Sequence, residues 1–341
     1  MSRLGRRALG VAGGLLLQKA LPEPPDRWHP VSWFGIAMQK VEAIGYADDR
    51  SAGVRHALAG VAIGGLAGGA IRSTSLAVSI CAAGRELRRA ASLIETPLLT
   101  GDLAVARIAL PSLVGRDPSH LDASGIAAAV VESLAENSVD AVVAPAFWGV
   151  IVGAPGVMVH RAINTMDAMV GHRNDRYENF GWAAARLDDG ANWVPAKLFA
   201  LLVMTAAPAR ARAVRASVRR DAHLHPSPNS AVAEAAVAAA LGRELGGPLQ
   251  YGERHEDRPR LGDGPRPEAA DIAGARELTS RTEWALIGTL VLLWWADRRL
   301  GRVSIRVSDT RRSPDGIDLP DLRSAQGQVG SRRTDGGRER S

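Results

Sequence analysis

Three acidic residues with helical spacing are the first feature of this chain that could do chemistry. Glu132, Glu136 and Asp140 recur every four residues, which places them on one face of a helix. Three like charges on one face repel one another unless a cation lies beside them. Mg²⁺ takes oxygen ligands and commonly binds one or two carboxylates together with substrate phosphates. The spacing therefore predicts a Mg²⁺ site at Glu132, Glu136 and Asp140, and a solvated helix face is the alternative.

A second polar face follows an apolar run. His160, Asn164 and Asp167 recur at positions i, i+4 and i+7, and Arg161 lies beside them. Ionisable groups on an otherwise apolar helix are functional candidates when the helix lies in a membrane. We therefore predict that His160, Asn164 and Asp167 are catalytic. For His160, a structural histidine with satisfied hydrogen bonds is the alternative.

The segment from 172 to 189 mixes basic and acidic side chains. Arginine can bind a phosphate group through two parallel hydrogen bonds, so Arg173 and Arg176 are candidate phosphate contacts. An internal salt-bridge network is the alternative. The sequence has no Walker A motif, dinucleotide fingerprint, HExxH or paired CxxC. The candidates for binding a phosphate-bearing cofactor are Arg161, Arg173, Asn174, Asp175, Arg176 and Arg186.

Several apolar segments must position these side chains. They comprise residues 8–17, 54–71, 139–159, 193–207 and 284–296. The run 139–159 has the length of a membrane span, but Pro145 and Pro155 interrupt it, so we expect it to be broken or re-entrant. The fold class predicted is all-α, a multi-pass integral membrane protein; a soluble all-α protein is the alternative.

Gly60, Gly64 and Gly68 fall four apart in the second apolar segment, as do Gly65 and Gly69. This spacing predicts a smooth helix face that a second helix can approach closely. The single cysteine, Cys81, excludes an intrachain disulfide and is expected to be a small core residue.

The placement of the basic residues supports the membrane interpretation. The 341 residues carry a net charge of +6, and the arginines form short groups beside apolar segments. That placement is typical of loops that flank membrane segments, so we expect a lipid bilayer and no nucleic acid as partner. We predict a helical membrane domain at residues 1–302 and a disordered polar tail at 303–341, where little could form a core.

These motifs together closely resemble one known family, the adenosylcobinamide-phosphate synthases (CobD/CbiB) of cobalamin biosynthesis. The resemblance covers roughly residues 8 to 300. The chain departs from the family pattern at 21–25, where the family usually has Asp-Pro, and in the tail. The segments that carry the resemblance are Arg27-Trp-His-Pro-Val, Glu132-Ser-Leu-Ala-Glu-Asn-Ser-Val-Asp140, Asn164-Thr-Met-Asp-Ala-Met-Val-Gly171, Asn174-Asp-Arg-Tyr177, Phe180-Gly-Trp-Ala-Ala-Ala-Arg-Leu-Asp-Asp189, Asn192-Trp-Val-Pro195, His225-Pro-Ser-Pro-Asn229 and Gly246-Gly-Pro248.

The resemblance implies a multi-pass enzyme of the cell membrane with its active site on the cytoplasmic face. The family joins a propionate carboxylate of adenosylcobyric acid to aminopropanol or its phosphate, using ATP and Mg²⁺, to give adenosylcobinamide or its phosphate. No bound redox cofactor is expected. A homo-oligomer, or association with other enzymes of the late corrinoid pathway, is left open. The alternative function is a non-enzymatic membrane scaffold or sensor on the same helical frame.

One conflict follows from this topology. Motifs of the resemblance lie both before and after the apolar run 193–207. A simple span there would place them on opposite sides of the membrane, whereas ATP is available on one side only. We therefore predict that 139–159 or 193–207 is broken or re-entrant, or that one motif is purely structural.

Overall fold

The computed structural model describes residues 1–115, 117–172, 174–224, 227–251 and 254–309, and these residues are predominantly helical. The α-helices are α1 (Arg3–Ala20), α2 (Pro30–Gly45), α3 (Arg50–Ile71), α4 (Thr74–Cys81), α5 (Gly84–Leu99), α6 (Leu103–Ala109), α7 (Ala123–Ser138), α8 (Ala144–Ile151), α9 (Ala154–Val170), α10 (Trp182–Ala206), α11 (Ala211–Asp221), α12 (Ser230–Leu241) and α13 (Ala269–Asp309). Short helical turns are η1 (Asp26–Trp28), η2 (Leu110–Ser112), the π-helical η3 (Val139–Val143), η4 (Pro208–Arg210) and η5 (Ala222–Leu224).

The all-α prediction holds except for one antiparallel hairpin, which pairs β1 (Leu245–Tyr251) with β2 (Arg254–Leu261). This segment is rich in Gly and Pro, and the sequence pattern did not identify it as strands. Gly246 adopts a φ of 76°, in the left-handed region where glycine is tolerated without strain. Helix α13 runs to Asp309, beyond residue 303 where we predicted the tail to begin. Residues 310–341 of that tail lie outside the described part of the chain.

One helix is long and apolar enough to cross a membrane within the described ranges, namely α3. A second candidate is formed by Trp182–Ala206 with Pro208–Leu224, but this pair is bent by 111°. Such helices also occur in the cores of soluble proteins, so the multi-pass arrangement stays a prediction. The run 139–159 is divided among η3, α8 and the start of α9, and the chain turns at Gly153 with a φ of 90°.

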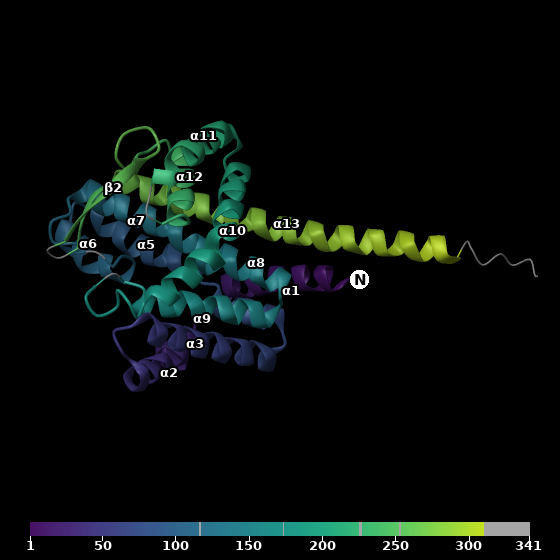
Figure 1. Ribbon diagram of the computed structural model, residues 1–341. Helices are drawn as coiled ribbons and strands as arrows, with labels where there is room; N and C mark the ends of the chain where they lie inside the picture. Colours follow the sequence, from purple (N-terminus) through teal and green to yellow (C-terminus); the bar gives the residue numbers. More distant parts are fainter. Residues whose placement is uncertain (116, 173, 225–226, 252–253, 310–341) are drawn as a thin grey trace, which may run out of the picture. The chain divides into compact units, whose positions relative to one another are not determined.

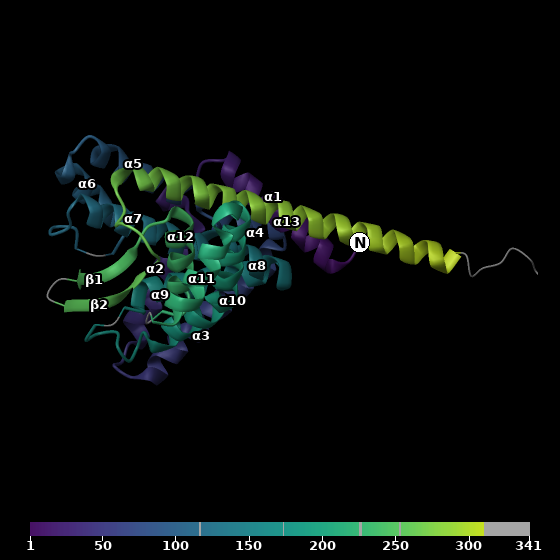
Figure 2. The same ribbon diagram turned by 90° about the horizontal axis from the view of Figure 1, so that it is seen from above.

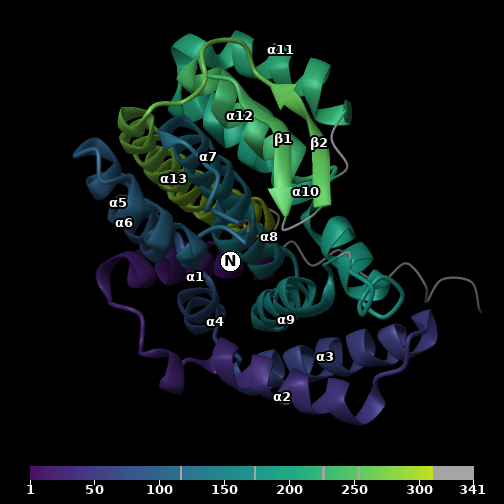
Figure 3. The ribbon, with the colours of Figure 1, turned by 90° about the vertical axis from the view of Figure 1, so that its left-hand side faces the viewer.

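Helices α2, α3 and α9 lie beside one another, and α11, α12 and the hairpin lie on the other side of α9 and α10 (Figure 3). The α3–α9 contact uses the predicted glycine face. A side chain at Gly64 would meet the Met158 carbonyl oxygen, and one at Gly68 would meet the backbone of Pro155. Gly69 has open space around it. The prediction of close approach is therefore confirmed for the Gly60, Gly64 and Gly68 face.

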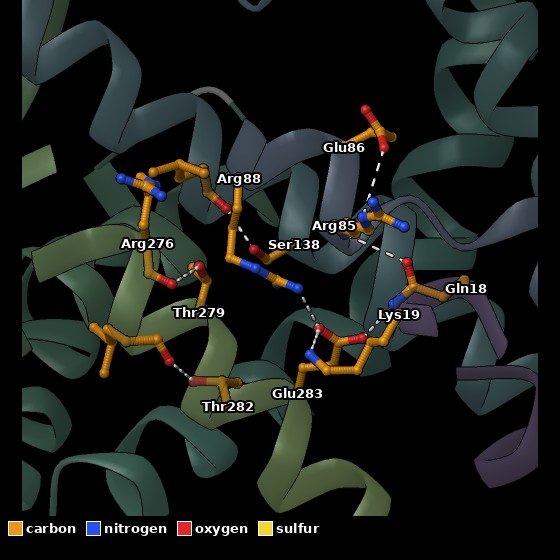
Figure 4. Close-up of polar contacts among 12 residues, drawn as sticks. Gln18, Lys19, Arg85, Glu86, Arg88, Ser138, Arg276, Thr279, Thr282 and Glu283 are labelled. Carbon is orange, nitrogen blue, oxygen red and sulfur yellow. Dashed lines mark hydrogen bonds and ion pairs between the residues drawn. The ribbon is translucent and has the colours of Figure 1, made fainter. Parts of the chain in front are cut away.

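Helix α1 runs antiparallel to residues 283–297 of α13 (Figures 1 and 2). The two are joined by Glu283, whose carboxylate is 1% exposed and accepts hydrogen bonds from Gln18 at 2.5 Å and from Lys19 and Arg88 at 2.8 Å (Figure 4). A buried carboxylate needs several hydrogen bonds and positive charges around it, because removing its charge from water costs free energy. Glu283 therefore ties α1, α5 and α13 into one unit.

The predicted core residue Cys81 is 1% exposed, which confirms that prediction. Its helix, α4, packs on α1 and α9. The largest apolar core joins residues of α1, α4, α5, α7, α10, α12 and α13. A smaller core, around Met166 and Phe180, joins α9 to α2 and α3. The two cores hold α7, α9 and α10, the helices that carry most of the predicted site residues, against one another.

We expect Gly68→Ala to lower the free energy of unfolding by about 1–3 kcal/mol, because the added methyl group overlaps the backbone at Pro155. Gly69→Ala is the matched control and should be neutral or stabilising by about 0.5–1 kcal/mol, because alanine favours the helix and meets nothing there. Denaturant unfolding of the purified protein measures both. Equal effects of the two substitutions would contradict a close α3–α9 contact.

We expect Glu283→Gln to lower the free energy of unfolding by roughly 3–5 kcal/mol, because it leaves Lys19 and Arg88 without their buried counter-charge. The control is Glu277→Gln on the same helix. Glu277 pairs with Arg281 at 2.7 Å on an exposed face, so its loss should change stability by less than about 1 kcal/mol. A small effect at Glu283 would show that its ion pairs do not hold α13.

Candidate functional site

Three carboxylates from different helical segments come together where α7, α9 and α10 meet. They are Asp140 on η3, Asp167 on α9 and Asp188 on α10, and we call them the acid cluster. Asn164 joins two of them, because its side-chain N–H groups donate to Asp140 Oδ2 at 3.1 Å and to Asp188 Oδ1 at 3.4 Å. The sequence predicted Asp140, Asn164 and Asp167 at two separate places, and the fold brings them to one.

The negative charges gathered in the acid cluster favour the binding of protons or cations. Burial and the charges of Asp188 and Glu136 raise the pKa of Asp140 well above its ordinary value. Burial, followed by the charges of Asp188 and Asp189, raises the pKa of Asp167 to about 7. Partly buried acids that repel one another are a common arrangement in sites that bind a cation or transfer a proton.

The three acids predicted to bind Mg²⁺, Glu132, Glu136 and Asp140, do not all lie together. Glu132 is 3% exposed and accepts a hydrogen bond from the backbone N–H of Gly246 at 2.8 Å. Glu136 accepts from the Ser230 hydroxyl at 2.6 Å, and its charge raises the pKa of both Asp140 and Asp167, so Glu136 lies close to the acid cluster that contains Asp140. In the ranges that the structure describes, no group of three His, Cys, Asp or Glu residues is arranged to hold a metal ion.

The π-helical turn η3 follows α7 directly and carries Asp140. A π-helix carries one more residue per hydrogen-bonded ring than an α-helix, so residues after Ser138 are rotated relative to those before it. The three acids therefore do not lie along one regular α-helical face. Instead Asp140 turns toward Asn164 on α9. Turns of this kind are frequent at functional sites.

His160 is buried, at 1% exposure, and is linked to the acid cluster through Asn192. Its Nε2 is 2.9 Å from Asn192 Oδ1, and the Asn192 amide donates to Asp188 Oδ2 at 3.0 Å. Because this arrangement leaves Asn192 Oδ1 as an acceptor, we assign the proton to His160 Nε2. Burial lowers the pKa of His160 to about 4, so the ring is neutral at physiological pH. This geometry assigns His160 the task of orienting Asn192, and through it Asp188.

Arg161 is the basic residue nearest to these acids on α9. Its guanidinium donates to Asn164 Oδ1 at 3.1 Å and to the backbone carbonyl of Cys81. Its charge lowers the pKa of Asp140 and so offsets part of the repulsion among the acids. Arg186, at the start of α10, is exposed and lies 3.5 Å from Asp189. Arg161 therefore lies beside the acid cluster, whereas Arg186 lies beside Asp189, whose charge raises the pKa of Asp167.

The remaining residues predicted to contact a phosphate lie in the segment between α9 and α10, and one of them lies outside the described residues. Arg176 pairs with Glu42 on α2 at 3.0 Å and stacks over the Tyr46 ring at 4.2 Å. Asn174 Oδ1 accepts from the backbone N–H groups of Arg176 and Tyr177, which fixes the local turn. Arg176 therefore forms an internal ion pair, as the salt-bridge alternative predicts, whereas Asn174 stabilises a turn of the backbone. Asp175 is exposed, and Arg173 lies outside the described residues.

The site includes residues that the sequence motifs contained but that we did not predict as functional. Asp188 and Asn192 belong to α10. Asn229 donates to the Asp189 carbonyl oxygen at 2.8 Å, and Ser230 follows it with its bond to Glu136. The bend of 111° after α10 leads the chain into α11, and α12 then packs against both α7 and α10. The motifs on either side of residues 193–207 therefore meet, which removes the topological conflict without a second site.

Comparisons with known proteins agree on one family. The model of the family described as CobD/Cbib protein matches residues 11–279. The cobalamin biosynthesis protein CobD of Mycobacterium tuberculosis is 45% identical over 282 residues, covering 79% of this chain and 90% of the relative. The protein of that name from Rhodobacter capsulatus is 40% identical, covering 78% and 90%, and that from Chromobacterium violaceum 38%, covering 81% and 93%. No solved structure matches significantly. The chain belongs to the CobD/CbiB family.

Proposed function

We propose that this protein acts in cobalamin biosynthesis as an amide-forming enzyme. It joins a propionate carboxylate of adenosylcobyric acid to the amine of aminopropanol or of its phosphate, with ATP as the energy source. Membership of the family over residues 11–279 carries this proposal, since the curated relatives bear the name cobalamin biosynthesis protein. The acid cluster supports it, because it is assembled from the motifs by which the chain resembles the family.

The chemistry requires an activated carboxylate. An unmodified carboxylate is a poor acyl donor toward an amine, and ATP supplies the activation by phosphorylation. Mg²⁺ needs only one or two protein carboxylates when phosphates complete its coordination, so a set of three converging ligands is not required. Asp140 and Asp188 suit this role, because they share the Asn164 amide and gain a counter-charge from a bound cation. Arg161 and Arg186 would add positive charge for phosphate oxygens.

Asp167 is the candidate that takes a proton from the attacking amine. General bases work best when their pKa lies near the working pH, and burial with nearby acids raises the pKa of Asp167 to about 7. His160 is less suited to this task, because its Nε2 is engaged by Asn192 and its pKa is lowered to about 4. Asn164 holds Asp140 and Asp188 next to each other through its two side-chain hydrogen bonds. In this proposal the amine would lie next to Asp167, and Asp140 and Asp188 would hold the cation.

We expect Asp140→Asn and Asp167→Asn each to reduce ATP-dependent formation of adenosylcobinamide by about 100-fold or more, the range for loss of a positioned acid or base. Turnover of the purified, detergent-solubilised protein measures the effect. Glu178→Gln is the matched control, since Glu178 is exposed in the segment between α9 and α10. Unchanged turnover in both aspartate variants would refute the assignment of the site. Failure of the wild-type protein to form the amide would refute the function itself.

The raised pKa of Asp167 also predicts a stability effect that does not depend on turnover. Asp167 ionises near pH 7 in the folded protein but near pH 4 in the unfolded chain. Between these values the unfolded chain has lost its proton while the folded protein keeps it, so rising pH disfavours folding. Without Mg²⁺, the melting temperature should therefore fall from pH 5 to pH 8, and Asp167→Asn should reduce this fall.

Added Mg²⁺ should raise the melting temperature at pH 8 and have little effect at pH 5, where protons neutralise the acids. Thermal unfolding of wild type, Asp167→Asn and Glu178→Gln at both pH values provides the comparison. A Mg²⁺ effect that is equal at both pH values would argue against a cation among these acids.

A further inference from the structure

A basic hollow lies at the N-terminal end of α1, away from the acid cluster. It has a volume of about 290 Å³ and is lined by Arg3, Arg6, Arg7, Arg72 and Thr74. Helix α9 begins beside it, and Asp167 lies about 20 Å further along that helix at 1.5 Å per residue. The hollow is therefore separate from the candidate active site. We call it the arginine hollow.

The arginines of this hollow keep most of their positive charge unpaired. Arg7 donates to the carbonyl oxygen of Ile151 at 2.5 Å and Arg6 to that of Met1 at 3.2 Å, which are neutral acceptors. The side chains of Arg3 and Arg72 have no hydrogen bond or ion pair with the described residues. Asp297 lies near Arg6, but its carboxylate already accepts from the Ser2 backbone at 2.9 Å. Four guanidinium groups thus face the hollow with little compensation.

Helix ends add to this positive potential. The helices α1, α4 and α9 begin at Arg3, Thr74 and Ala154, around the hollow. A side chain at Gly153 would contact both Arg7 and Thr74, so the start of α9 lies directly beside the lining residues. Helix α9 has no side-chain cap at its N-terminus. Uncapped N–H groups and the helix dipole favour an anion, and phosphate is the usual one.

Apolar side chains beside the hollow indicate which kind of phosphate fits. Helix α3 ends at Ile71, next to Arg72, and only 28% of its apolar window is buried within the protein. Leu66 on α3, Leu4 on α1 and Ile151 on α8 are all exposed. A soluble phosphate compound gains nothing from such a surface, whereas acyl chains do. Basic residues just past an exposed apolar helix are where a lipid headgroup meets a protein.

We propose that the arginine hollow binds the phosphate group of an anionic membrane phospholipid, whose acyl chains lie along the exposed apolar side chains of α1, α3 and α8. The site holds the C-terminal end of α3 at the level of the headgroups. It also joins α1, α3 and α9 through one shared anion, since three lining arginines belong to α1, Arg72 directly follows α3, and α9 begins at the edge of the hollow.

The test compares lipid binding by full-length protein in detergent. Phosphatidylglycerol or phosphatidylcholine is titrated in, and bound lipid is counted by native mass spectrometry. Wild type should prefer phosphatidylglycerol. The double variant Arg3→Gln, Arg72→Gln should bind it about 25-fold more weakly, because two phosphate-facing charges are lost. Both residues are exposed, so folding should survive, and unfolding in phosphatidylcholine alone checks this.

The matched control is the double variant Arg212→Gln, Arg215→Gln, which removes the same charge from exposed positions on α11. It should bind phosphatidylglycerol like wild type. Equal loss in both double variants would overturn the proposal in favour of diffuse charge attraction. Displacement of the lipid by inorganic phosphate or glycerol phosphate at similar concentration would overturn the lipid as occupant, and so would the absence of any preference in wild type.

Discussion

The repulsion among Asp140, Asp167 and Asp188 is the constraint around which the rest of this structure is arranged. Bringing three partly desolvated carboxylates together raises their free energy, as the raised pKa values of Asp140 and Asp167 show. Apolar residues of similar volume would commonly stabilise such a position more. A fold that keeps these acids must hold their helices firmly, and it must provide donors that limit the cost. Asn164 and Asn192 supply those donors.

Packing on both sides of α9 keeps the acids from separating. On one side, Gly64 and Gly68 let α3 approach the backbone of α9, a contact that leaves little room for α9 to shift. On the other side, Arg161 fastens α9 to the Cys81 carbonyl at the end of α4. The buried Glu283 joins α1, α5 and α13 at a distance from the acids. The glycine face and Glu283, which lie outside the acid cluster, therefore position the site together with Arg161.

Helix periodicity was sufficient to find some of these features and insufficient for others. It identified the glycine face of α3 and the face of α9 that carries Asn164 and Asp167. It could not find η3, because one extra residue in a helical ring has no compositional signature. It also could not find the partner of Arg176, since Glu42 lies in a distant part of the chain and only the tertiary fold brings them together. Asp188 and Asn229 were present in the motifs, but their roles depend on the bend after α10.

The contacts along α3 constrain how a membrane can meet this protein. With 22 residues, α3 is about 33 Å long, close to the thickness of a hydrocarbon core. A side chain at Gly60, near its middle, would meet Met166, the neighbour of Asp167. If α3 crosses the bilayer, the acid cluster lies level with the membrane interior and must be shielded from lipid by protein. The helices α7, α10 and α12 on the far side of α9 are placed to provide that shield. A large polar site can in this way coexist with few fully apolar helices, because only one face of the helical unit needs to be apolar.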